Sequence, residues 1–176
     1  LTHWAQAGLI CIAARRQNQS TFALLEDWTP SGRDLSGDEA LSELVRRYFR
    51  SHGPATVKDF AWWSSLPMSE AKRALQLAAD LLESTTIDSI EYWQMRNTPA
   101  PSAGPSSILL LPPFDEYTVA YADRTAAADA SLLPSIGHGL APNILVNGRI
   151  AGTWKRTLSP RGDAIVLAST LLRILN

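Results

Sequence analysis

Cysteine, net positive charge and long apolar runs are all scarce in this chain of 176 residues. The single cysteine, Cys11, excludes an intrachain disulfide framework and a cysteine-based zinc site, which fits a reducing cytoplasm. No apolar run approaches the roughly 18 residues of a membrane-spanning helix. With 16 Lys and Arg against 17 Asp and Glu, the net charge is −1, and no segment is strongly basic. We therefore expect a cytoplasmic protein without a membrane partner, and any contact with a polyanion must come from a local patch.

Residues that perform catalysis or bind metals are also few. The histidines are His3, His52 and His138, and none of them has a partner at metal-ligand spacing. Cys11 lies in a predicted apolar strand, which favours a buried structural thiol over a nucleophile. The sequence has no phosphate-binding glycine loop and no serine-nucleophile elbow. We expect no catalytic residue, no metal and no cofactor in this chain.

The chain begins and ends inside patterned segments. Residues 1–10 resemble the last turns of a helix that stops at Gly8, and residues 167–176 form an apolar run. We therefore expect a piece of a longer protein.

Strand-like runs at 10–14 and 21–25 flank a polar stretch at 15–20, which predicts a β-hairpin with a basic, polar tip.

Three helices and a strand are predicted after a linker at 29–37. The first helix is capped by Ser36 or Asp38 and ends at Gly53 and Pro54. Thr56 caps the second helix, which runs from Val57 to about Ser65. The third helix has Pro67 in its first turn and runs to about Glu83, and residues 87–95 are predicted as a strand. Three helices followed by strands are typical of a winged helix.

A second linker, 97–107, separates this part from a region of short strands. Strands are predicted at 108–111, at 143–146 and 149–156 across an Asn-Gly turn, and at 164–168, with a short alanine-rich helix within 120–133. The pattern indicates a small antiparallel sheet or partial barrel. The predicted fold class is therefore α+β.

Two polar surfaces are candidate DNA contacts. The third helix presents cations and an amide that suit phosphates and base edges, namely Ser69, Lys72, Arg73 and Gln76. The hairpin tip offers Arg15, Arg16, Gln17, Asn18 and Gln19, which suit a phosphate backbone or a minor groove. The alternatives are a solvated face of a helical bundle and a polar turn that promotes solubility. Both interpretations of each surface stay open.

Other charged residues favour structural roles. Arg46, Arg47 and Arg50 lie near Glu39 and Glu43 at helical spacing, which indicates surface ion pairs. Asp115 and Glu116 follow two prolines. A carboxylic acid placed in a cleft is one interpretation of this pair, and the alternative is a cap for the next segment or a partner for Arg124 or Arg156.

Three separated strings carry a family resemblance, and the similarity that they mark extends over nearly the whole chain. They are RRYFRSHGPATVKDFAWWSSLPMSEAKRAL at 46–75, LLLPPFDEYTVAYADRT at 109–125 and ILVNGRIAGTWKRT at 144–157. The chain resembles the bacterial winged-helix DNA-binding proteins that include the DNA glycosylases acting on alkylated bases and interstrand crosslinks. This resemblance implies tandem winged helices followed by a small β-barrel. Residues 1–30 would be the C-terminal part of one winged helix, 36–96 a complete winged-helix domain, and 105–176 most of the β-barrel-like domain.

The resemblance does not extend to a catalytic site. The glycosylases of this family are similar in a glutamine–hydrophobic–glutamine (or aspartate) motif in the first winged-helix domain, which is absent here. Gln17, Asn18 and Gln19 imitate its spacing, but the middle residue is polar, so no catalytic role is carried over.

Three functions remain open at this point. The first is duplex DNA binding, of moderate to weak affinity, by a fragment of a larger bacterial protein. The second is a place in a glycosylase whose catalytic domain lies upstream. The third is a protein scaffold, favoured by the near-neutral charge and six Trp.

Overall fold

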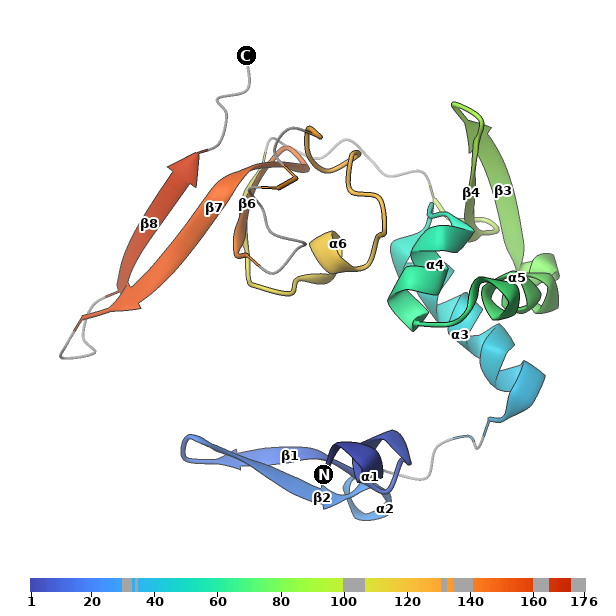
Figure 1. Cartoon of the computed structure of the whole chain (residues 1–176), viewed down its shortest axis with the longest axis horizontal. Coiled ribbons are helices and arrows are strands. Elements are labelled where there is room, and N and C mark those ends of the chain that lie inside the picture. The colour runs from blue at the N-terminus through green and yellow to red at the C-terminus, as the bar shows by residue number, and fades with distance from the viewer. Residues whose placement is uncertain are drawn as a thin grey trace. The chain divides into compact units, whose positions relative to one another are not determined.

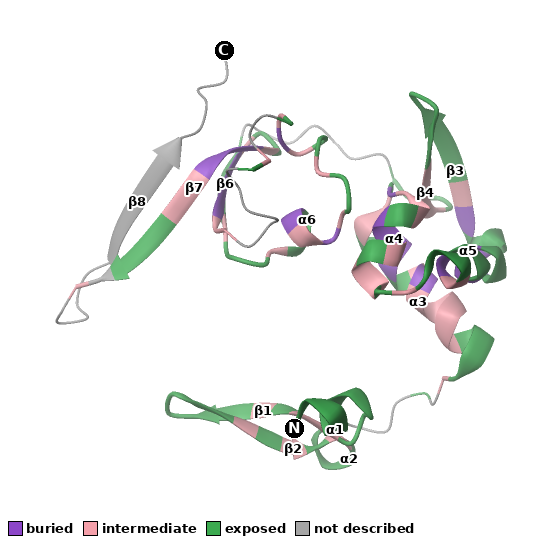
Figure 2. Cartoon of the chain, viewed as in Figure 1, coloured by how far each residue is buried: buried purple, intermediate pink, exposed green. Residues whose placement is uncertain are grey.

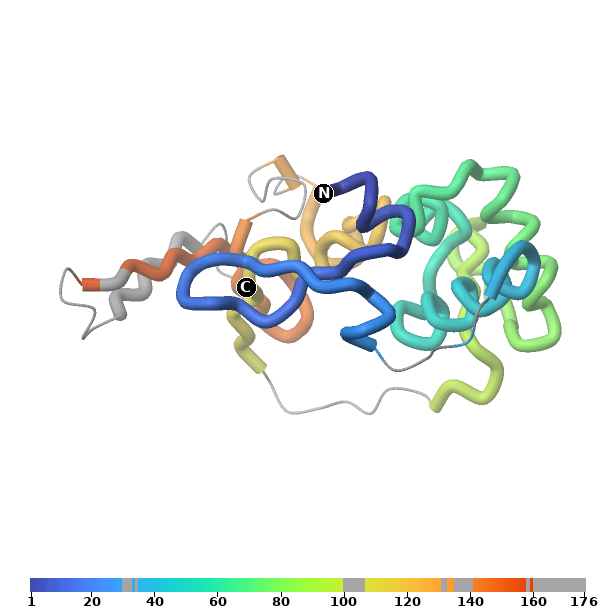
Figure 3. The backbone as a smooth tube through the Cα atoms, turned by 90° about the horizontal axis from the view of Figure 1, so that it is seen from below, coloured from blue at the N-terminus to red at the C-terminus, as the bar shows by residue number. Residues whose placement is uncertain are grey.

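The computed structural model divides the chain into two compact units, residues 1–37 and 38–176 (Figure 1). It describes residues 1–29, 33, 35–99, 107–130, 133–134, 141–159 and 165–171. In the last of these ranges it describes the backbone alone. The backbone of each unit can be followed from a second direction in Figure 3.

The first unit is a β-hairpin with a short helix at each end. Helix α1 (Thr2–Gln6) precedes strand β1 (Ile10–Arg16), which pairs with β2 (Gln19–Leu24) before helix α2 (Leu25–Trp28). The predicted hairpin is confirmed, but its strands are longer than expected and the turn shrinks to two residues. After a register shift between Ala13 and Arg16, the ladder closes at the pair Arg16 and Gln19, which satisfies more backbone groups.

The second unit begins with three helices around an aromatic core. They are α3 (Gly37–His52), α4 (Val57–Ser64) and α5 (Met68–Leu77), and a 3₁₀ turn η1 follows (Ala79–Leu81). Tyr48, Phe49 and Phe60 are almost wholly buried in this core. Figure 2 shows in purple the buried parts of the three helices. The predicted cap of α4 is confirmed, since the Thr56 hydroxyl accepts a hydrogen bond from the backbone N–H of Asp59.

The third helix is shorter than predicted. It ends at Leu77 instead of near Glu83, and Pro67 is its N-cap instead of part of its first turn. Leu82 is buried in the helical core, but it reaches that core from a strand. The apolar spacing that predicted a longer helix therefore reflects burial, while the backbone leaves the helix to pair with a neighbouring strand.

An antiparallel hairpin follows the helices. Strands β3 (Leu82–Ile87) and β4 (Ile90–Met95) pair throughout, and both turn residues, Asp88 and Ser89, have positive φ angles. The strand predicted over 87–95 is therefore interrupted at its start by a turn, and β3 was missed. Ala55 forms a further bridge to Trp93, which joins the loop before α4 to β4.

The rest of the second unit contains a four-stranded antiparallel sheet. Its strands run in the order β5 (Ile108–Leu111), β6 (Asn143–Val146), β7 (Arg149–Leu158) and β8 (Ile165–Leu171). The Asn147–Gly148 turn between β6 and β7 is confirmed, and both of its residues have positive φ. Ile144, Leu145 and Ile150 are buried on this sheet.

The helix predicted within 120–133 is not found among the residues described in that range. A four-residue helix, α6 (Glu116–Val119), lies just before it and is capped by the Asp115 carboxylate. After α6, Asp123 accepts hydrogen bonds from the backbone and hydroxyl of Thr125. Such local side-chain bonds stabilise a turn and outweigh the helix preference of the alanines.

Candidate nucleic-acid interface

The exposed face of α5 carries the four residues that were predicted from the sequence as DNA contacts. Ala71, Ala74 and Leu75 are buried on its inner side, so helical geometry directs the other side to solvent. Ser69, Lys72, Arg73 and Gln76 are all exposed. They share one face of a helix that follows α4 after a three-residue turn.

The two cations on this face differ in their partners. Arg73 forms an ion pair with Asp38 on α3 and a longer one, at 3.5 Å, with Glu70. Among the described residues Lys72 forms no ion pair. The charge of Arg73 is therefore partly compensated, whereas that of Lys72 is available to a ligand.

The hairpin of the first unit presents the second predicted surface. Arg15 and Arg16 lie in β1, Gln17 is the first turn residue with a φ of 55°, and Gln19 begins β2. All four side chains are exposed. Arg15, Arg16 and Gln19 thus lie on strands and not in an extended loop, because the ladder runs to the turn. The structure groups these residues at one end of the hairpin.

The β3–β4 hairpin has the opposite charge. Its charged residues are Glu83, Asp88 and Glu91, and it has no lysine or arginine. Ile87 and Ile90 are exposed beside its turn. A hairpin of this composition repels phosphate, so we do not place a DNA backbone contact there.

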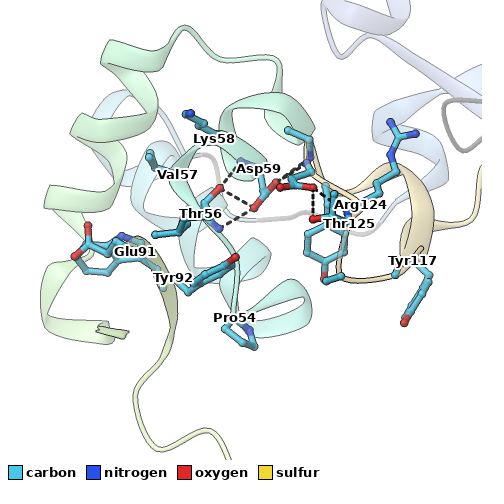
Figure 4. Close-up of a pocket in the computed structure, with 17 residues that line it drawn as sticks. Pro54, Thr56, Val57, Lys58, Asp59, Glu91, Tyr92, Tyr117, Arg124 and Thr125 are labelled. Carbon is cyan, nitrogen blue, oxygen red and sulfur yellow. Dashed lines mark hydrogen bonds between the residues drawn. The ribbon is translucent and has the colours of Figure 1, made fainter. Parts of the chain in front are cut away.

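A groove that the sequence did not indicate lies between α4, β4 and residues 117–127. Its volume is about 690 Å³. Pro54 and Tyr92 lie on one side of it and Thr125 on the other (Figure 4). Tyr117 and Tyr121 also line the groove. The lining residues of its two sides are between 24 and 73 residues apart in sequence, and no short motif indicates contacts over such separations.

The Asp59 carboxylate connects the two sides of this groove. Asp59 is only 4% exposed. One carboxylate oxygen accepts from the backbone N–H and hydroxyl of Thr56, at 2.8 and 2.7 Å. The other accepts from the backbone N–H groups of Ala122 at 2.8 Å and Asp123 at 3.4 Å. A capping residue of α4 thereby also fixes the segment after α6.

Asp115 and Glu116 have structural partners. Asp115 caps α6, so the capping interpretation is confirmed. Glu116 accepts a hydrogen bond from the Trp63 indole at 3.2 Å and lies at the same distance from Nε2 of His52. No ion pair of either carboxylate with Arg124 or Arg156 is found among the described residues.

His52 is part of an aromatic cluster. Its ring stacks on Tyr48 with a centroid distance of 5.0 Å, and Trp63 and Tyr121 lie beside it. Burial raises the pKa of the Tyr48 and Tyr121 hydroxyls, and the nearby Asp59 carboxylate adds to the shift. No cluster of metal-binding side chains occurs in the described parts of the chain, and His138 lies outside them.

The ion pairs predicted on α3 are confirmed for Arg46 and Arg47, whereas no ion pair of Arg50 is found among the described residues. Glu43 is bonded to Arg46 at 2.7 Å and to Arg47 at 2.8 Å. These hydrogen bonds lower the pKa of Glu43 from 4.5 to about 2.

Cys11 is half-buried in β1, less buried than predicted, because this small unit covers little of the hairpin. Where the chain is described, no helix is long and apolar enough to cross a membrane.

Comparison with known proteins decides the family. Residues 1–173 match the family model described as "DNA glycosylase AlkZ-like". The chain belongs to the AlkZ-like DNA glycosylase family. This result confirms the resemblance to the DNA glycosylase family that the sequence showed.

One curated relative of this AlkZ-like chain is an interstrand DNA cross-link repair glycosylase of Streptomyces sahachiroi. The two are 25% identical over 166 residues, which cover 86% of the chain and 44% of the relative. The chain thus spans less than half the length of this relative. A solved structure, DNA glycosylase AlkZ of the same organism, matches with a TM-score of 0.67 and 23% identity over 84% of the chain and 43% of that protein. The shared fold is mixed α+β with antiparallel sheets.

Proposed function

We propose that this AlkZ-like chain is a duplex-DNA-binding part of a larger bacterial repair protein. In this proposal residues 36–96 are a winged-helix domain, residues 1–30 the C-terminal part of another, and residues 105–176 a small β-barrel-like domain. DNA contacts come from Ser69, Lys72, Arg73 and Gln76 on α5 and from Arg15, Arg16, Gln17 and Gln19 on the β1–β2 hairpin.

The order of elements around α5 supports this proposal. Three helices and an antiparallel hairpin follow one another in the order expected of a winged helix, and in such a domain α5 would be the recognition helix. The single observation that carries the proposal is the exposed polar face of α5 in a chain of a DNA-repair family. An amide at Gln76 beside a cation at Lys72 suits base edges and phosphates.

The charges predict modest affinity. The net charge is −1, Arg73 is held by Asp38 and Glu70, and the β3–β4 hairpin is acidic. Few phosphates are therefore neutralised, and binding is expected to weaken as salt rises.

Anisotropy of a labelled 20-base-pair duplex tests the proposal. The chain is titrated at ~50 and ~200 mM salt, since each phosphate contact steepens the log–log salt dependence by about 0.9. The K72A variant is expected to weaken binding and to reduce the slope by about 1. Binding that is absent at low salt, or that ignores both salt and this substitution, contradicts duplex-DNA binding.

The alternative is that the larger protein is a glycosylase for alkylated or crosslinked DNA. The family assignment and the greater length of the relative favour it. Its catalytic domain would lie outside this chain, to which we assign no catalytic residue, metal or cofactor. Release of alkylated base from DNA, measured with the full-length protein and with this chain alone, tests the alternative. Release by the full-length protein alone supports it, and release by neither rejects it.

A further inference from the structure

We propose that the groove between α4, β4 and residues 117–127 binds an unpaired nucleotide. The base stacks on Tyr92, and the phosphate is neutralised at the rim by Lys58 and Arg124. This inference rests on the proposed function, because it assigns a second DNA-contacting site to the same chain. We refer to this site as the Tyr92 groove.

The size and walls of the Tyr92 groove suit a flat ring with a sugar and a phosphate. A volume of about 690 Å³ lies within the range typical of small-molecule sites. In Figure 4 the Tyr92 ring extends from β4 toward the side formed by residues 117–127. Aromatic side chains accept any base by stacking, provided that a face of the base is exposed.

Most polar groups of the groove already have partners. The Tyr117 and Tyr121 hydroxyls donate to the carbonyls of Gly148 and His52. Asp59 accepts four hydrogen bonds. Asp123 accepts two from Thr125, which lower its pKa. These groups shape the groove but do not bind a ligand strongly.

The groups without partners are mainly donors. Among the described residues neither the Tyr92 hydroxyl nor the Lys58 ammonium forms a hydrogen bond or ion pair, and the buried Nε of Arg124 has no acceptor. Glu91 is the remaining carboxylate at the rim, and it is exposed. Lys58 extends from α4 and Arg124 from the segment after α6, and in Figure 4 both side chains point away from the Tyr92 ring. Donors around an aromatic wall favour an anion that carries a ring.

These features favour an unpaired nucleotide over a base pair. In duplex DNA both faces of each base are covered by neighbouring pairs, so a ring such as Tyr92 reaches a base face only after the base leaves the stack. The chemistry fits a nucleotide bulged from a duplex and also a strand end.

The test compares three labelled DNAs with the intact chain: a paired duplex, the same duplex with one bulged thymidine, and a thymidine 12-mer. We expect the bulged duplex to bind about tenfold more tightly than the paired one, which is the order of one stacked base. Tighter binding of the 12-mer than of the bulged duplex assigns the groove to single-stranded DNA, strand ends included. Equal affinity for all three DNAs overturns the inference.

Three variants, Y92A, Y92F and K58A, test whether the preference for the bulged duplex arises in the Tyr92 groove. Y92A is expected to abolish the bulge preference, whereas Y92F, which keeps the ring, retains most of it. K58A, an exposed position, is expected to weaken the bulged complex alone, while the matched K72A weakens the bulged and paired complexes equally. A bulge preference that survives both Y92A and K58A overturns the inference.

The outcome separates this inference from the proposed function. Paired-duplex binding that is sensitive to K72A, without a bulge preference, rejects the Tyr92 groove and leaves the proposed function intact. Binding of the bulged duplex without binding of the paired duplex supports the Tyr92 groove and rejects duplex-DNA binding as the proposed function. Aromatic grooves also bind proline-rich peptides. A decaproline probe that binds the chain and is lost in Y92A, without any bulge preference, assigns the groove to a peptide and overturns the inference.

Discussion

The carboxylate of Asp59 on α4 accepts a hydrogen bond from the backbone N–H of Ala122, 63 residues further along the chain, at 2.8 Å. The same side chain completes the capping box of α4 with Thr56. One buried carboxylate therefore stabilises a helix end and positions the segment that forms one side of the Tyr92 groove.

Replacing Asp59 tests this double role. D59A leaves the donors of Thr56 and Ala122 without their acceptor, and we expect a loss of about 2–4 kcal/mol in the free energy of unfolding. T56A removes the cap alone and is expected to cost about 1 kcal/mol. Urea unfolding measures both variants. Equal losses for T56A and D59A would contradict the role of Asp59 outside α4.

Gly53 is predicted to resist substitution because two backbone segments meet there. A Cβ atom at this position would lie 2.5 Å from the carbonyl oxygen of Phe49 and 3.1 Å from Cα of Gln94. Since neither backbone can move freely, we expect G53A to lower the free energy of unfolding by about 1–3 kcal/mol. The exposed control S69A is expected to change it by less than about 0.5 kcal/mol. Urea unfolding measures the free energy of unfolding of both variants. Equal values would show that β4 can shift to accommodate the added methyl group.

Stability at acid pH is expected to depend on Glu43. Its pKa is lowered from 4.5 to about 2 by Arg46 and Arg47, so its stabilising effect is present above pH 4.5 and is lost as the pH falls toward 2. E43Q is therefore expected to be less stable than the parent chain at pH 7, with the difference disappearing near pH 2. Urea midpoints across this range measure it. The control D80N removes an exposed carboxylate for which no ion pair is described, and a similar profile for D80N would contradict the assignment.

Release of Arg73 is expected to strengthen DNA binding. D38N removes a carboxylate that holds Arg73, so the guanidinium becomes available to phosphate. We expect roughly a threefold gain in affinity for paired duplex beyond the gain from D80N, which removes the same charge elsewhere. Anisotropy at low salt measures both variants. If D38N and D80N behave alike, Arg73 does not contact DNA through this face.

The sequence determined the elements that depend on neighbouring residues. Thr56 caps α4, and the Asn147–Gly148 turn joins β6 to β7, because a capping hydroxyl and a positive φ act within a few residues. The polar face of α5 followed from helical spacing in the same way. By itself the sequence therefore located most helices and strands and the residues of the candidate DNA face.

Tertiary structure decided where the elements end and how distant residues meet. Leu82 is buried from a strand and not from a helix, because pairing with β4 competes with the helical backbone. The partners of Arg73 and both sides of the Tyr92 groove come from separate segments. Residue spacing indicates the face of a helix or strand on which a side chain lies. Contacts between distant segments depend on how the whole chain packs, and local residue preferences do not determine that packing.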